Sequence, residues 1–248
     1  MPDDNPNTDE RFYEHSTYSD EVIAWACRRA AQYFDGWRPR IRELRRKRDL
    51  RVLDIGSGTC ALAMLLSAQE NVAGVVATDI SPARMRLNVE RVSANQNGDL
   101  SKVDFQRLDF NEKFPFEDGA FDLVTADAAL HHSQSMWFTL SEINRVLSDG
   151  GAFAAQREAF LATITASFVM RRLLRSPEFE AGVSENAYLK SQYAYYLSAA
   201  GFSPTFIPWI PDGPFRAAPP LNGHVFARYL IWAPKSEPPR YSSRPRPS

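Results

Sequence analysis

Strand-like and helix-like segments alternate along the middle of the chain. Short apolar runs rich in Val, Ile, Leu and Phe are followed by longer runs with apolar residues at helical spacing. We predict strands at residues 51–56, 72–80, 103–110, 121–130, 151–159, 203–210 and 224–233, and helices at residues 59–69, 82–95, 135–148 and 185–200. Such alternation predicts a parallel sheet built from right-handed crossover units. Only a loop rich in proline and glycine separates the last two strands, which predicts an antiparallel hairpin at the sheet edge.

The composition excludes several classes of partner. The chain has 248 residues, which suits a single α/β domain with additions. Its net charge of −1 provides no bulk attraction to nucleic acid or to an anionic membrane. The longest weakly polar run, residues 159–170, is far shorter than the roughly 20 residues that span a bilayer. Two cysteines and the absence of a signal-peptide pattern favour a reduced, cytoplasmic protein.

A glycine turn follows the first predicted strand, in the stretch VLDIGSGTC at residues 52–60. Gly56 and Gly58 allow a tight turn and a close approach of the backbone to a ligand. With Ala61 they fit the dinucleotide-binding pattern, but the carboxylate of Asp54 would repel a pyrophosphate and attract a cation. No Gly-Lys-Ser/Thr sequence follows, so the turn is not a P-loop.

The next two predicted strands also end in acids. Asp79 follows the glycines by roughly 20 residues, the spacing at which a carboxylate accepts ribose hydroxyls. Asp109 stands beside Phe110, a pair that suits the amine and the face of an adenine ring. Taken singly, Asp79 could cap a helix and Asp109 could start a turn. Three acids at adjacent strand ends, without a phosphate clamp, instead favour S-adenosyl-L-methionine, an adenosine that carries positive charge.

Four segments resemble the successive motifs of the class I S-adenosylmethionine-dependent methyltransferases: residues 52–60, 75–81, 108–132 and 143–159. The resemblance covers about residues 51–158 in the usual order of that family. It implies a Rossmann-like α/β fold, a doubly wound, mostly parallel, seven-stranded sheet with an antiparallel last strand. It also implies S-adenosyl-L-methionine as the cofactor.

The resemblance assigns parts of the cofactor to particular positions. The turn from Asp54 to Gly58 would lie along the methionine part, Asp79 would take the ribose, and Asp109 with Phe110 would border the adenine. Cys60 stands where many members have a third glycine, and we expect its bulk to tighten the pocket. The residues expected to bind the cofactor are Asp54, Gly56, Ser57, Gly58, Asp79, Ile80, Asp109, Phe110 and Asp127.

Two adjacent histidines, His131 and His132, follow the fourth predicted strand, where the transferred methyl group should point. They are the candidate catalytic residues. Neighbouring side chains project in different directions, so we expect at most one to face the substrate, and the alternative role is to cap the next helix. No third His or Cys lies at ligand spacing, so we predict no metal site.

The remaining candidates bind the acceptor. Arg157 ends the fifth predicted strand and could hold a substrate carboxylate, or form an internal ion pair instead. Tyr13 and Tyr18 lie in the first segment, residues 1–50, which we expect to form a helical cap because such segments cover the active site in related small-molecule enzymes. Its apolar residues at helical spacing are Ile23, Ala26, Ala30 and Phe34.

We divide the rest of the chain into a methyltransferase domain, residues 51–233, and a disordered tail rich in Pro, Ser and Arg, residues 234–248. Residues 160–184 form an insertion that we interpret as a lid, with Phe160, Ile164 and Phe168 on one helical stripe. Packing of these covers onto the core or onto a second subunit, as in a homodimer, is the alternative. Aromatic covers favour a small, partly apolar acceptor.

These observations predict methyl transfer to an oxygen, nitrogen or carbon atom of a small molecule, in a biosynthetic pathway. Nucleobase amine methylation in this fold is typically marked by an Asn/Asp-Pro-Pro-Tyr turn after the fourth strand, and residues 126–132 read ADAALHH instead. Two alternatives stay open. One is a biosynthetic enzyme that uses the same cofactor without methylating, and the other is a cofactor-binding subunit without catalysis.

Overall fold

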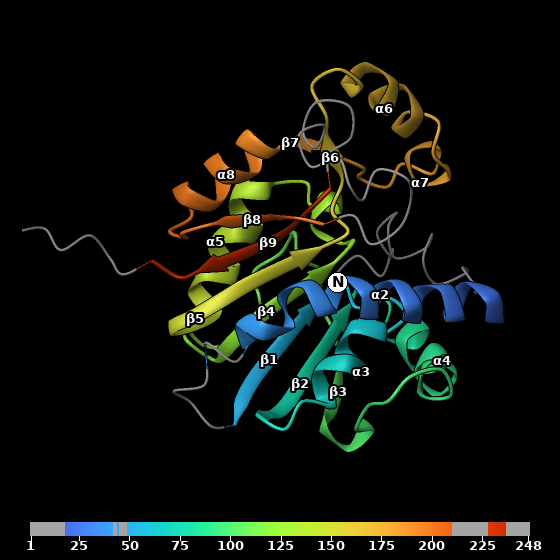
Figure 1. Cartoon of the computed structure of the whole chain (residues 1–248), viewed down its shortest axis with the longest axis vertical. Helices are drawn as coiled ribbons and strands as arrows, with labels where there is room; N and C mark the ends of the chain where they lie inside the picture. The colour runs from blue at the N-terminus through green and yellow to red at the C-terminus, as the bar shows by residue number, and fades with distance from the viewer. Residues whose placement is uncertain (1–17, 42–43, 45–48, 210–227, 237–248) are drawn as a thin grey trace, which may run out of the picture.

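A seven-stranded sheet forms the centre of the computed structural model, which describes residues 18–41, 44, 49–209 and 228–236 (Figure 1). The strands are β1 (Leu50–Ile55), β2 (Val72–Asp79), β3 (Val103–Arg107), β4 (Phe121–Asp127), β5 (Leu147–Gln156), β8 (Thr205–Pro208) and β9 (Tyr229–Pro234). Their order across the sheet is β3-β2-β1-β4-β5-β9-β8, with β1 to β5 parallel. The last strand, β9, is antiparallel to both β5 and β8. The predicted fold class and the edge hairpin are confirmed.

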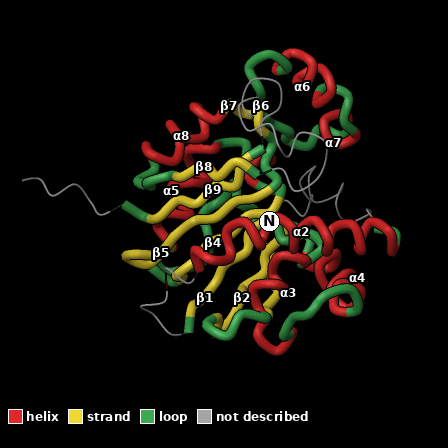
Figure 2. The backbone as a smooth tube through the Cα atoms, viewed as in Figure 1, coloured by secondary structure: helices red, strands yellow, loops and turns green. Residues whose placement is uncertain are grey.

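Helices cover both faces of this sheet (Figure 2). They are α2 (Asp20–Ile41), α3 (Ala61–Ser67), α4 (Pro82–Ser93), α5 (Met136–Val146) and α8 (Lys190–Ala199). One apolar cluster joins α2, α3 and α4 to the sheet, and a second joins α5 and α8 to it. All residues of β4 before Asp127 are buried, as expected for a central parallel strand covered on both faces.

Helix α2 is fixed to the sheet at the carboxyl end of β5. The residues predicted at helical spacing, Ile23, Ala26, Ala30 and Phe34, are all buried. Trp37 is fully buried, and its Nε1–H donates to Oε1 of Gln156, the last residue of β5, over 2.8 Å. Burial of this apolar stripe therefore places α2 beside the strand ends where a ligand is expected. The residues of the predicted cap before Tyr18 lie outside the described residues.

The segment between β5 and α8, which includes the predicted insertion at residues 160–184, differs from the prediction. It contains the short parallel strands β6 (Phe160–Leu161) and β7 (Tyr188–Leu189), and the helices α6 (Ala166–Leu173) and α7 (Pro177–Glu180). The predicted helical stripe is wrong, because Phe160 is buried in β6 while Ile164 and Phe168 are 72% and 70% exposed. Spacing alone did not reveal the pairing of β6 with β7. Because of that pairing, the helix predicted to begin at residue 185 begins at Lys190 instead.

β3, β4 and β5 each end three residues earlier than predicted, next to the candidate site. β3 stops at Arg107 because the carboxylate of Asp109 accepts a hydrogen bond from the Asn111 N–H over 2.9 Å and starts a turn. β4 stops at Asp127 because Ala128 takes a φ of 54° and a short 3₁₀ turn follows at Leu130–His132. A second 3₁₀ turn, Leu100–Lys102, precedes β3. Among the described residues, no helix has the length and apolar character needed to cross a bilayer.

Candidate functional site

A cavity of about 210 Å³ lies where the carboxyl ends of β1 to β4 meet. Seven of the predicted site residues line it: Tyr18, Gly56, Asp79, Ile80, Asp109, Phe110 and His132. Leu108, Asn111, Ala128 and Ala129 complete its wall together with Arg84 and Glu178, which sequence reasoning missed. Tyr13 and the predicted tail beyond Ser236 lie outside the described residues. The fold therefore gathers cofactor and acceptor candidates from distant parts of the chain into one space.

The glycine turn has a backbone that requires glycine at two places. Gly56 and Gly58 have φ values of 62° and 52°, a region that residues with a side chain rarely adopt. A Cβ atom on Gly56 would lie 2.6 Å from the Cβ of Ala129. Cys60 also has a positive φ, 66°, but its side chain is fully buried in the core and does not line the cavity. The expectation that Cys60 narrows the pocket is therefore wrong.

Asp54 supports the turn from the interior of the sheet. Its carboxylate accepts hydrogen bonds from the hydroxyls of Thr125 (2.6 Å) and Ser57 (2.7 Å), and the residue is 1% exposed. Burial raises its pKa to about 7, against the opposing effect of these two hydrogen bonds. Neither Asp54 nor Ser57 lines the cavity. Their role in binding a cationic ligand stays a prediction, and the geometry gives them a role in fixing the turn.

Asp79 and Asp109 line the cavity and also organise the backbone around it. Asp79 accepts the Gly58 N–H over 2.9 Å and the Ser81 N–H over 3.0 Å, one on each carboxylate oxygen. Asp109 accepts the N–H of Asn111, as described above. Asp79 therefore does hydrogen-bond to the backbone at the start of α4, and Asp109 does start a turn. Both residues also line the cavity. Each carboxylate oxygen has a further lone pair with which it can accept from a ligand hydroxyl or amine.

Arg84 places a positive charge inside this cavity. It lies in the first turn of α4, which Pro82 starts, and it is 9% exposed. Its Nη2 atom is 2.8 Å from the position that a Gly58 Cβ would take, and its Cζ lies 5.3 Å from the Tyr18 ring. Asp79 and Arg84 together give the cavity groups of both signs. That set suits a zwitterionic ligand such as an amino acid joined to a nucleoside.

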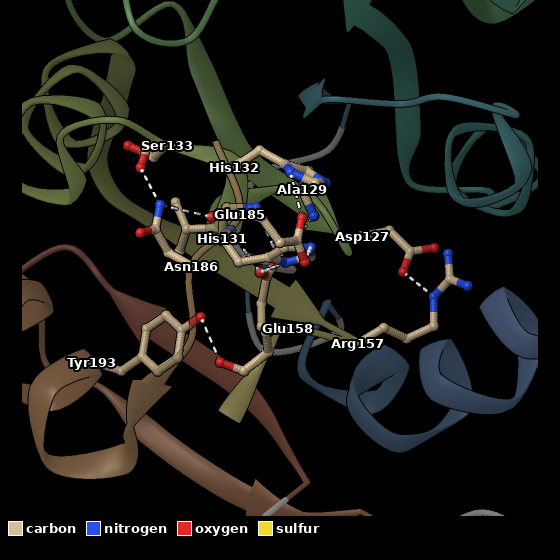
Figure 3. Close-up of polar contacts among 12 residues, drawn as sticks. Asp127, Ala129, His131, His132, Ser133, Arg157, Glu158, Glu185, Asn186 and Tyr193 are labelled. Carbon is tan, nitrogen blue, oxygen red and sulfur yellow. Dashed lines mark hydrogen bonds and ion pairs between the residues drawn. The ribbon is translucent and has the colours of Figure 1, made fainter. Parts of the chain in front are cut away.

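His131 is buried and its ring contacts Glu158 (Figure 3). It is not among the residues that line the cavity. Its Nδ1 lies 2.8 Å from Glu158 Oε2, and the same carboxylate accepts the backbone N–H groups of Ala129, Leu130 and His131. Burial would raise the pKa of Glu158, but the hydrogen bond from His131 and those from the backbone outweigh it and leave that pKa lowered. An ionised Glu158 therefore fixes both the turn after β4 and the orientation of the His131 ring.

His132 is the histidine that lines the cavity. Its Nδ1 lies 2.8 Å from the Ser184 carbonyl oxygen and 3.1 Å from Glu185 Oε2 (Figure 3). Because a carbonyl can only accept, Nδ1 carries the proton and Nε2 is the nitrogen that can take one. Burial lowers the pKa of His132, but the bonds to Glu185 and Ser184 outweigh it and leave the pKa raised. Of the two histidines, only His132 lines the cavity, and the expectation that at most one faces the substrate stays a prediction.

Glu185 joins the two histidines into a cluster that the sequence did not reveal. Its carboxylate lies 3.9 Å from His131 Nε2 as well as beside His132. One ligand atom from each of the three residues lies within 4.8 Å of the others, so this set could hold a metal ion. The prediction of no metal considered only a third His or Cys, and Glu185 directly follows the predicted insertion. That prediction remains untested.

Arg157 and Asp127 form an ion pair beside α2, the blue ribbon in Figure 3. Arg157 Nε lies 2.5 Å from Asp127 Oδ1, and the two side chains are 18% and 7% exposed. The internal ion pair that the sequence left open is therefore present. Asp127 does not line the cavity, so its predicted contact with the cofactor has no support from that placement. Arg157 lines a second cavity, described below.

Comparison with known proteins agrees with this geometry. Residues 53–155 match the model of a family described as a methyltransferase domain. A demethylmenaquinone methyltransferase of Symbiobacterium thermophilum is 38% identical over 103 residues, 41% of this chain and 40% of that protein. A malonyl-[acyl-carrier protein] O-methyltransferase of Geobacter sulfurreducens is 29% identical over 104 residues, 42% of this chain and 37% of that protein. The chain thus spans about two fifths of the length of these relatives.

Solved structures share the fold over a larger part of the chain. A SAM-dependent methyltransferase from Thermotoga maritima, described as a possible histamine N-methyltransferase, has a TM-score of 0.59 at 14% identity and covers 92% of this chain and 99% of its own. The YcgJ protein from Bacillus subtilis has a TM-score of 0.58 at 20% identity and covers 77% of this chain and 94% of its own. Residues 53–155 therefore form an S-adenosylmethionine-dependent methyltransferase domain, and the solved structures share its fold.

Proposed function

We propose that this chain transfers the methyl group of S-adenosyl-L-methionine to an oxygen, nitrogen or carbon atom of a small-molecule acceptor. The observation that carries the proposal is a single cavity lined by the ribose and adenine candidates, Asp79, Asp109 and Phe110, and by His132. The names of the relatives, which refer to menaquinone and malonyl groups, support a small acceptor. A biosynthetic role, a cytoplasmic location and a homodimer stay predictions.

In this proposal residues at the carboxyl ends of β1 to β3 would hold the cofactor. Asp79 would accept hydrogen bonds from the ribose hydroxyls, and Asp109 and Phe110 would border the adenine. The turn from Gly56 to Gly58 would hold the methionine part, and the nearby guanidinium of Arg84 suits its carboxylate. When bound, the cofactor supplies a methyl group activated by the sulfonium charge. The protein contributes alignment of the acceptor with that methyl group and exclusion of water.

His132 is the proposed general base for an acceptor that must lose a proton. Its Nδ1–H is held by the Ser184 carbonyl and by Glu185, so Nε2 can accept the acceptor's proton while Glu185 stabilises the imidazolium. Glu185 acts through His132 and is a positioning residue. Because the pKa of His132 is raised, its imidazole becomes neutral, and able to accept a proton, only at a higher pH than an ordinary histidine. An acceptor that is already ionised needs no such base.

Calorimetric titration with S-adenosylhomocysteine and with NAD tests the cofactor assignment. We expect S-adenosylhomocysteine to bind and NAD not to bind. Since a lost hydrogen bond to a charged group costs about 1.5 to 3 kcal/mol, Asp79→Ala should weaken binding by about tenfold or more. Asp104→Ala is the matched control, an exposed acid on β3 that forms no part of the cavity. Equal affinities in the two folded variants would overturn the ribose assignment.

Two alternative functions compete with the proposed methyl transfer, and one experiment distinguishes them. Mass spectrometry of small molecules that co-purify with the protein would name acceptor candidates for a turnover assay. A methylated product formed together with S-adenosylhomocysteine supports the proposal. An altered product without methylation would indicate a different use of the cofactor, and tight cofactor binding with no turnover would indicate a non-catalytic subunit.

A further inference from the structure

A second cavity, of about 350 Å³, adjoins the first, and Ala128 lines both. Its walls carry four aromatic side chains, from Trp25, Tyr33, Phe160 and Tyr229. These come from α2, β6 and β9, so the cavity lies between α2 and the end of the sheet. Trp25 is half exposed, and the other three rings are mostly buried. Such a lining suits an aromatic or other planar apolar group.

Three arginines share this space: Arg29, Arg157 and Arg228. Both Arg29 and Arg157 place their guanidinium carbons close to the Trp25 ring, at 5.9 Å and 5.7 Å from its centroid. One carboxylate, that of Glu158, lies in the described lining, and it accepts from His131 and from three backbone N–H groups. The lining therefore has an excess of positive charge.

The arrangement of α2 accounts for two walls of this cavity. Trp25, Arg29 and Tyr33 are spaced four residues apart, so they form one stripe along the helix. The core-facing residues of α2, such as Ile23, Ala30 and Phe34, lie on a different stripe. The helix thus has one face that holds it to the core and another that offers two aromatic rings and a guanidinium to the cavity.

Arg157 is pre-oriented for a further contact. It follows the last residue of β5 with a φ of 57°, and Asp127 engages its Nε atom (Figure 3). That contact fixes the plane of the guanidinium and leaves its two Nη groups on the other edge. A planar guanidinium held in this way suits a carboxylate, because the two groups can form parallel hydrogen bonds.

We propose that the second cavity binds the acceptor by a carboxylate, with the planar apolar part of the acceptor between the aromatic walls. This inference rests on the proposed methyl transfer, because the shared Ala128 wall places the other end of such an acceptor in the first cavity, beside His132. A carboxylate held by guanidinium groups is a poor nucleophile, since its charge is engaged. The methylated atom is therefore a hydroxyl oxygen, an amine nitrogen or a carbon at the opposite end of the acceptor.

The test compares 4-hydroxybenzoate with its neutral analogue 4-hydroxybenzamide, titrated by saturation-transfer NMR into the full chain with S-adenosylhomocysteine present. We expect the acid to bind about tenfold or more tightly than the amide, as for a charge-assisted bond. Arg29→Gln should remove most of this preference. Arg38→Gln is the control, since Arg38 lies on the same helix and pairs with Asp35 at the surface. Arg157→Lys keeps the charge near Asp127 but removes the planar fork, and should weaken the preference too.

Three results would overturn the inference: equal affinities for acid and amide, no binding of the acid while S-adenosylhomocysteine binds, or an unchanged preference in folded Arg29→Gln. The binding of S-adenosylhomocysteine in the same samples separates the two levels of the proposal. If it does not bind, the proposed function fails. If it binds and the acid is not preferred, only the carboxylate site fails.

Discussion

At the scale of single residues, the site depends on side chains that have two roles at once. Asp79 holds the glycine turn and faces the cavity, and His132 lines the cavity while Glu185 and the Ser184 carbonyl fix its ring. Such residues are rigid before any ligand arrives, which is what alignment of two reactants requires.

Replacing His132 should separate chemistry from cofactor binding. Loss of a general base costs roughly 10²- to 10⁴-fold in rate, so His132→Ala should lower the single-turnover rate by that amount with an acceptor that must lose a proton. Its affinity for S-adenosylhomocysteine should stay within a few fold. His131→Ala should instead lower stability, because Glu158 would lose a buried partner. Near-normal rates in His132→Ala would show that catalysis rests on alignment alone.

The pH dependence of activity should show whether Glu185 raises the pKa of His132. His132 accepts a proton only when neutral, so activity should fall as the pH drops through its pKa, which contact with Glu185 helps to raise. In Glu185→Gln the carboxylate is gone, the pKa falls, and the acid limb of kcat/KM should move to lower pH. Glu180→Gln, at an exposed acid of α7, is the control and should leave the limb in place. A limb that stays fixed in Glu185→Gln would argue against His132 as the titrating base.

The glycine turn offers a test with a closely matched control. Gly56→Ala adds both left-handed backbone strain, about 1 to 2 kcal/mol, and a contact with Ala129 that cannot be accommodated without movement. Gly150→Ala, with a φ of 75° and nothing within 4 Å of the added Cβ, brings the strain alone. Both variants should unfold at lower urea concentrations, and only Gly56→Ala should lose S-adenosylhomocysteine affinity by roughly tenfold or more. Similar affinities in the two variants would show that the turn does not touch the cofactor.

At the scale of elements, the predictions succeeded where local periodicity determines the structure. Each strand of the sheet and the buried stripe of α2 follow from apolar spacing. The place of Asp79, Asp109 and Phe110 around one cavity follows from their positions at strand ends, and their roles in binding the cofactor stay predictions. Glu185 and Arg29 were not predictable in this way. Their importance depends on which distant segments meet. Glu185 reaches His132 in a segment held by the hydrogen bond from the Asn186 N–H to the His131 carbonyl and by the pairing of β6 with β7. The same pairing made the predicted stripe through Phe160 wrong.

The docking of α2 should depend on one buried hydrogen bond. Trp37→Phe keeps most of the apolar contact but leaves the Gln156 side chain without the 2.8 Å bond from the indole, at a cost of about 1 to 3 kcal/mol. Urea unfolding measures this cost. Trp137→Phe is the control, since that side chain is half exposed on α5 and should change stability by less than about 0.5 kcal/mol. Equal effects of the two substitutions would mean that the bond to Gln156 does not anchor α2.

At the scale of the whole molecule, two adjoining cavities lie along the carboxyl edge of the sheet, one lined by the cofactor candidates and one by aromatic and arginine side chains. The insertion with α6 and α7 lies above this edge in Figure 1, and α2 runs beside it. We expect both elements to enclose the acceptor, in keeping with the cap and lid predicted from the sequence.

Transfer of an isotopically labelled methyl group examines the whole proposal at once. The full chain would be incubated with methyl-labelled S-adenosyl-L-methionine and the small molecules that co-purify with it, and products would be followed by mass spectrometry. We predict that the label moves into a small molecule bearing a carboxylate, with an equal amount of S-adenosylhomocysteine, and that Asp79→Ala slows this transfer while Asp104→Ala does not. If the wild-type chain binds the cofactor but the label remains in S-adenosyl-L-methionine with every acceptor candidate, the chain is not the methyltransferase proposed here.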